Sequence, residues 1–79
     1  MQLRKMTESE QQLCEDLVWA ESASEVQQNP DHYGKFVAIH KKRVLGFGSD
    51  RQALVREVAE REKVAWQELV VVIVARPSL

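Results

Sequence analysis

The chain has 79 residues and a mass of 9.1 kDa, which is enough for one small domain spanning residues 1–79. Hydrophobic residues make up 44% and charged residues 29%, and the three glycines and two prolines exclude a collagen-like or linker-like chain. The single cysteine, Cys14, excludes an internal disulfide framework. Together with two histidines it supplies only three of the four nitrogen or sulfur ligands of a structural zinc site. We therefore expect no metal and no cofactor.

Two further absences predict a cytoplasmic protein with no membrane partner. The longest apolar run, Leu69 to Ala75, has seven residues and is too short to cross a bilayer. Residues 1–8 lack the apolar stretch of a secretory signal.

Charge is distributed unevenly along the chain. Residues 1–34 hold two basic and seven acidic side chains, whereas residues 35–79 hold nine basic and five acidic ones. This predicts an acidic element beside a mildly basic body. A domain that binds nucleic acid strongly would usually be more basic overall, so nucleic acid is a possible partner that the composition does not favour.

The first predicted element is a helix over residues 7–28. Thr7 and Glu10 have the spacing of a capping box at its start, and Pro30 disfavours helical geometry just after its end. Apolar residues at helical spacing predict a buried stripe, which comprises Leu13, Cys14, Leu17, Val18 and Ala20.

The apolar character then moves around this helix. Trp19, Ala23 and Val26 lie well over 90° from Cys14 and Val18 on a helical wheel. Either the helix wraps across a twisted surface, or Trp19 contacts a second chain.

Residues 35–48 predict a β-hairpin. Two short runs rich in β-branched and aromatic residues flank the basic segment Lys41-Lys42-Arg43. Because the centre of the turn holds neither Gly nor Asn, we expect a loop of three to five residues.

Residues 50–63 predict a second helix, which Asp50 caps. Its expected buried face comprises Leu54, Val55, Val58 and Ala59.

Residues 68–76 predict the last strand. Its run of Val and Ile is typical of an interior strand that is covered on both faces. The expected fold is α+β: an N-terminal helix followed by ββαβ, with a three-stranded mixed sheet packed by helices. We expect a homodimer, because so small a domain buries little surface alone. A monomer with both helices folded over the sheet is the alternative.

The pattern of residues from Tyr33 onward resembles a known family. A tyrosine, a Gly-Lys pair, an aromatic residue and Val-Ala precede a basic turn and a helix that begins at a small residue and Asp; the first six are Tyr33, Gly34, Lys35, Phe36, Val37 and Ala38. This pattern resembles a family of short bacterial and archaeal domains of unknown function over residues 30–77, although Phe36 stands where the family commonly has Trp. The resemblance implies a fold but no activity. A weaker similarity to HicB-type ββαβ antitoxin domains implies an antitoxin role.

Three local motifs could bind a ligand or a partner. Tyr33 and Lys35 could flank a pocket, but we interpret Gly34 as a residue with unusual dihedrals and Tyr33 as core packing. Residues 46–50 superficially resemble a phosphate-binding turn, but they lack the third glycine of a dinucleotide fingerprint, so we interpret them as a strand end and a helix cap. Residues 40–43 form a basic turn that is solvated, contacts phosphates, or meets the acidic first helix through Asp16, Glu21 or Glu25.

No group of residues predicts catalysis. His32 and His40 have no Ser or Cys in a recognisable arrangement, and Cys14 is expected to be a small buried residue. The pair Glu15–Asp16 is expected on a charged, solvated helix face.

The sequence therefore predicts a non-catalytic protein-interaction module that acts as a homodimer or with a protein partner. It would bind through the exposed edge of the sheet, or through the face around Trp19 and the first helix. The candidate partner-binding residues are Trp19, Tyr33, Lys35, Lys41, Lys42 and Arg43. The alternative is an antitoxin-like or nucleic-acid-associated regulator that uses the basic turn.

Overall fold

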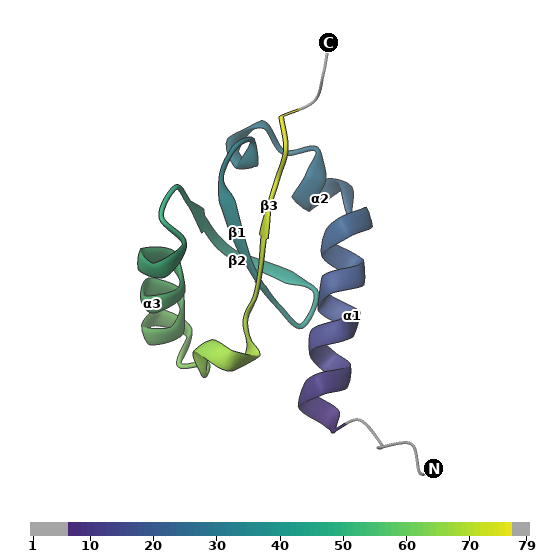
Figure 1. The fold of residues 1–79 in the computed structure, drawn as a ribbon, viewed down its shortest axis with the longest axis vertical. Helices are drawn as coiled ribbons and strands as arrows, with labels where there is room; N and C mark the ends of the chain where they lie inside the picture. Colours follow the sequence, from purple (N-terminus) through teal and green to yellow (C-terminus); the bar gives the residue numbers. More distant parts are fainter. Residues whose placement is uncertain (1–6, 77–79) are drawn as a thin grey trace, which may run out of the picture.

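The sheet lies between two helices, α1 on one face and α3 on the other, in a computed structural model that describes residues 7–76 (Figure 1). The helices and strands, in chain order, are α1 (Glu8–Ser22), α2 (Ser24–Gln27), the 3₁₀ turn η1 (Pro30–His32), β1 (Phe36–His40), β2 (Arg43–Gly48), α3 (Arg51–Glu62), the 3₁₀ turn η2 (Trp66–Glu68) and β3 (Val70–Ile73). The predicted α+β class is confirmed.

The strand order is β2-β1-β3, and β1 pairs antiparallel with both neighbours. The prediction of a mixed sheet is wrong, because both strand pairings are antiparallel. The connection through α3 crosses over β1, so that β2 and β3 lie on opposite sides of it. β3 therefore runs parallel only to β2, which it does not touch. A single isolated bridge, between Tyr33 and Val74, is parallel.

The last strand is not the interior strand that its sequence predicts. β1 is central, and its Val37, Ala38 and Ile39 are fully buried, whereas β3 forms one edge of the sheet. β3 has apolar side chains on both faces: Val70 packs in the cluster that includes Ala20 of α1, and Val71 packs against the cluster that includes Leu54 and Val58 of α3. The cover is incomplete on the α3 side, where Ile73 is 62% exposed. An apolar run of this kind therefore does not require a neighbouring strand on each side.

The predicted helix over residues 7–28 is two helices that meet at Ala23. This residue has φ −71° and ψ 128°, which is extended backbone. The Ser22 hydroxyl donates to the Val18 carbonyl at 3.1 Å, a local bond that competes with helical pairing. The break turns the chain so that Val26 in α2 is fully buried, which accounts for the drift of the apolar stripe.

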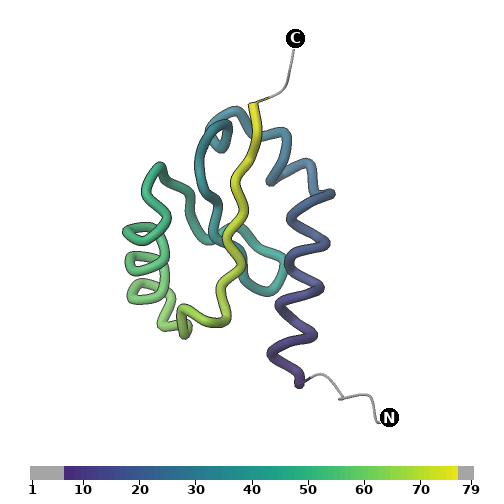
Figure 2. The backbone as a smooth tube through the Cα atoms, in the orientation of Figure 1, coloured from purple at the N-terminus to yellow at the C-terminus, as the bar shows by residue number. Residues whose placement is uncertain are grey.

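The buried face of α1 is also not the predicted one. Ala20 is buried, as expected, but Cys14 is exposed and Val18 is 67% exposed. Instead Asp16 is fully buried, because it binds the turn between β1 and β2, which reaches α1 (Figure 2). Trp19 is half-buried and packs against the core.

α3 follows its sequence closely. The Asp50 carboxylate accepts the Ala53 amide at 3.2 Å, and Leu54 and Val58 are buried against the sheet, as predicted. Lys63, in the left-handed conformation with φ 56°, ends the helix. Within residues 7–76 no helix has the length and apolar character needed to cross a membrane.

Candidate interaction interface

The β1–β2 turn contains only Lys41 and Lys42. His40 pairs directly with Arg43, so the prediction of a three-to-five-residue loop is wrong. Both lysines have left-handed backbone, with φ 51° and 56°. This conformation matches the twist of a tight hairpin, but it is unfavourable for residues other than Gly, Asn or Asp. Another group must therefore stabilise the turn.

That group is the Asp16 carboxylate. Its Oδ2 accepts the Lys41 amide and its Oδ1 accepts the Lys42 amide, both at 2.9 Å, while Gln12 Nε2 donates to Oδ1 at 2.9 Å. Of the alternatives for the basic turn, the structure shows the contact with the first helix, which Asp16 makes through the backbone of the turn. The prediction that Asp16 lies on a solvated face is wrong, because these three donors stabilise the charge inside the protein.

The side chains of the basic turn point outward among acidic neighbours. Lys41 lines a small hollow with Glu8 and Glu68, and Lys42 lines another with Glu15. Because the two backbone amides already bind Asp16, only the side chains are left to meet a phosphate. The arrangement suits a turn that anchors α1 to the sheet.

Tyr33, Gly34 and Lys35 join the start of β1 to the end of β3. Gly34 has φ +74°, as the structural interpretation predicted, and its amide donates to the Val74 carbonyl at 2.8 Å. Tyr33 packs against the core, and Lys35 Nζ lies 5.4 Å from the centre of the Phe47 ring. These residues hold the edge strand rather than form a pocket.

Both histidines are engaged in packing and hydrogen bonds. The buried His32 donates from Nδ1 to the Val26 carbonyl at 2.9 Å, and its ring lies 5.0 Å from Phe47. His40 Nδ1 donates to the Glu68 carbonyl at 3.3 Å. Within the described part of the chain, no three His, Cys, Asp or Glu side chains gather as a metal site requires.

The β2 edge of the sheet carries features that oppose strand pairing. The register shifts between Ala38 and Ile39, so that Leu45 is an extra residue in a β-bulge. The Arg61 guanidinium donates to the Leu45 carbonyl, and Arg43 places an exposed charge within the strand. Bulges, charges and covering side chains are the usual devices by which proteins protect an edge strand.

The β3 edge is different. The Val74 amide donates to the Lys35 carbonyl at 3.1 Å, so residue 74 directs its backbone toward the β1 side. In an antiparallel ladder this direction alternates, and therefore Val70 and Val72 also face β1 while Val71 and Ile73 direct their N–H and C=O groups away from it.

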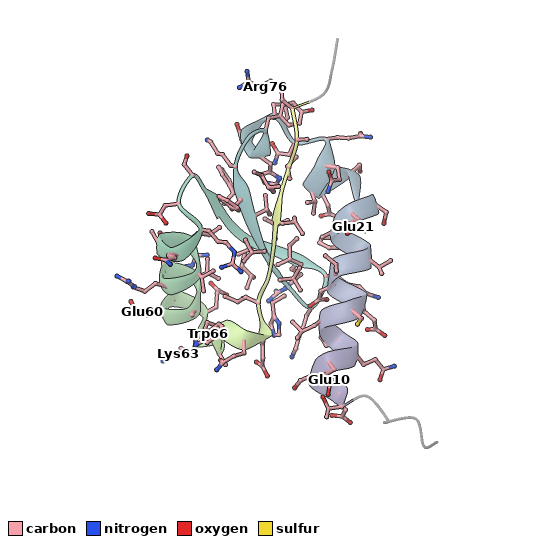
Figure 3. The ribbon with its side chains drawn as sticks, viewed as in Figure 1. Glu10, Glu21, Glu60, Lys63, Trp66 and Arg76 are labelled. Carbon is pink, nitrogen blue, oxygen red and sulfur yellow. The ribbon has the colours of Figure 1, made fainter. Side chains whose placement is uncertain are left out.

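The side chains of β3 fit an open edge as well. Ile73 is 62% exposed, and β3 holds no charged residue. Figure 1 shows β3 in front of the other two strands, with its outer edge toward the viewer. The ends of the strand are marked by Trp66 in η2 and by Arg76 (Figure 3).

The predicted partner-binding residues do not form one surface. Tyr33 and Lys35 lie near the last residues of β3, Lys41 and Lys42 lie in the hairpin turn, and Trp19 packs against the core. The sequence predicts binding through an exposed edge of the sheet, but it does not single out Val71 or Ile73. In the sequence these two residues belong to the apolar run of residues 68–76, which predicts a covered strand and does not show which of its residues lie at an open edge.

A shallow hollow of about 420 Å³ lies beside α3. Its lining residues are Arg51, Gln52, Val55, Arg56, Ala59, Glu60 and Trp66. Trp66 is 64% exposed there, and η2 leads from it into β3. No Ser, Thr, Cys or His side chain is among the described residues that line this hollow.

Comparisons with protein-family models, curated proteins and solved structures give no match to the chain.

Proposed function

We propose that this protein is a non-catalytic interaction module that binds an extended protein segment along the β3 edge. The observation that carries the proposal is the difference between the two edges: β2 has a bulge, a strand charge and a capped carbonyl, whereas β3 has none of these. A flat, uncharged edge strand accepts another strand readily.

An added strand would give hydrogen-bond partners to the backbone groups of β3 that point away from β1. The N–H and C=O groups of Val71 and Ile73 would pair with the backbone of the added strand, and main-chain hydrogen bonds of this kind supply affinity. The Ile73 side chain, now 62% exposed, would be partly covered by a cross-strand neighbour. Burial of this side chain adds an apolar term of about 1 kcal/mol or more.

The basic turn gives less support to a nucleic-acid-associated or antitoxin-like function. The amides of Lys41 and Lys42 bind Asp16, and acidic side chains share the hollows that both lysines line. A positive surface that tracks a phosphate backbone requires charge that is not balanced nearby.

The test compares two lysine substitutions at equally exposed apolar residues. Ile73→Lys places a charge on the β3 edge, and Val18→Lys places the same charge on the outer face of α1, where the exposed fraction is 67%. We expect Ile73→Lys to abolish partner capture or self-association in light scattering and pull-down measurements, and Val18→Lys to leave it unchanged. Equal effects of both substitutions would contradict the proposal.

Amide hydrogen exchange provides a second readout. The Val71 and Ile73 amides should exchange quickly when the edge is free and slowly when a strand is bound, whereas Val70 and Val72 should be protected in both states. Fast exchange at Val71 and Ile73 under every condition that permits binding would place the partner elsewhere.

A further inference from the structure

The backbone directions and charges along β3 indicate which strand would pair with it. Resting on the proposed function, we propose that the added strand is β3 of a second copy of the chain, paired antiparallel with Val72 on the twofold axis. Each copy would contribute three strands to one continuous six-stranded sheet. A twofold arrangement uses the same edge on both copies and closes after two subunits, whereas a parallel head-to-tail arrangement would leave a free edge.

Hydrogen-bond direction restricts the register. Val71 and Ile73 direct their backbone outward, and in a self-paired strand each must face a residue that also points outward. Only three central registers meet this condition: Val71 facing Val71, Ile73 facing Ile73, or Val71 facing Ile73. A slip by one residue would place outward groups opposite Val70 or Val72, which already bind β1.

Charge selects among these three registers. Glu68 precedes β3 and Arg76 follows it, so an antiparallel partner brings unlike ends together. With Val71 facing Ile73, the residue count brings Glu68, the last residue of η2, to the level of Arg76 of the other copy, and symmetry forms this pair twice. The other two registers place Arg76 opposite Trp66 or opposite Val70, and leave both charges without this match.

The same register improves the apolar contacts. Val71 and Ile73 lie on the α3 face of β3, where α3 packs against β1 and β2 and leaves β3 less covered. Each exposed Ile73 would pack directly against Val71 of the second copy. On the opposite face, the twofold axis would place both α1 helices side by side, since α1 packs over β1 and β3.

Cysteine scanning across the strand reads the register directly. In a Cys14→Ser background, which removes the natural thiol, we would place a single cysteine at residue 71, 72 or 73 and oxidise the purified protein. Only Val72→Cys should form a disulfide-linked dimer efficiently, because residue 72 alone faces itself across the axis. Preferential cross-linking through residue 71 or 73 would overturn the proposed register.

A charge swap tests the same register without thiols. Glu68→Arg and Arg76→Glu should each weaken the dimer by about tenfold, as two attractive pairs become repulsive, and the double substitution should restore it. Glu25→Arg and Arg56→Glu, which alter exposed charges away from β3, serve as controls and should have little effect. Additive weakening in the double variant would contradict the proposal.

The outcomes separate this inference from the proposed function. If the chain dimerises and Ile73→Lys disrupts the dimer, but residue 72 does not cross-link and the charge swap fails to rescue, the strand-accepting edge stands and the register is wrong. If sedimentation shows a monomer up to millimolar concentration while β3 still captures an extended peptide, the second copy is the wrong occupant. If Ile73→Lys changes no association at all, both proposals fail.

Discussion

The two edges of this small sheet differ in whether other features oppose pairing with a further strand. Along β2 there is a bulge at Leu45, Arg61 binds the Leu45 carbonyl, and Arg43 adds a charge. Along β3 the outward groups of Val71 and Ile73 have no comparable device. If only one edge is open, two sheets can pair through it and no further sheet can be added. The predictions below test how the protected side is built.

The largest expected effect concerns the carboxylate that holds the hairpin turn. Asp16→Ala removes the acceptor of the Lys41 and Lys42 amides and leaves two left-handed residues without support. Hydrogen bonds to a charged group contribute about 1.5–3 kcal/mol each, so we expect a loss of about 3–4 kcal/mol in the free energy of unfolding. Urea denaturation measures this loss. Glu15→Ala, at the exposed neighbouring residue, should change it by less than about 0.5 kcal/mol.

Asp16 also shows where sequence reasoning fails. A carboxylate between Glu15 and Leu17 in an acidic helix has the pattern of a solvated face, and only the distant turn that it binds makes burial favourable. The sequence predicted the order of the elements and both helix caps, because these depend on neighbours along the chain. It did not predict which strand is central, since β1 and β3 are both mostly apolar.

The residues of the proposed β3 edge were not singled out in the sequence for the same reason. The lysines of the turn and Trp19 are conspicuous in the sequence, so they were assigned to partner binding. The residues that carry the proposal, Val71 and Ile73, are ordinary strand residues. What distinguishes them is the direction of their backbone groups, which is set by pairing with β1 and has no signal in composition.

An intermediate effect is expected at the contact between β2 and α3. A Cβ atom at Gly46 would lie 3.2 Å from Cγ2 of the buried Val58, so in Gly46→Ala the Val58 side chain must shift by a few tenths of an ångström within the packed contact between β2 and α3. We expect destabilisation by about 1–2 kcal/mol in the same urea measurement. Gly48 is the matched control, because no atom lies within 4 Å of its Cβ position and Gly48→Ala should be neutral or slightly stabilising. Equal costs at both glycines would show that strand propensity, and not helix packing, decides the result.

The smallest effect on stability, and the sharpest test of the difference between the edges, is expected from Arg61→Ala. Arg61 is half-exposed and lies 3.8 Å from Glu57, a surface pair that contributes little, so the free energy of unfolding should fall by about 1 kcal/mol or less. The substitution nevertheless frees the Leu45 carbonyl on the protected edge. We expect species larger than a dimer in light scattering at high concentration, because a second edge becomes available. Arg56→Ala, which removes an exposed arginine from the same helix without touching β2, is the control. Unchanged assembly in Arg61→Ala would mean that the bulge and Arg43 protect β2 without it.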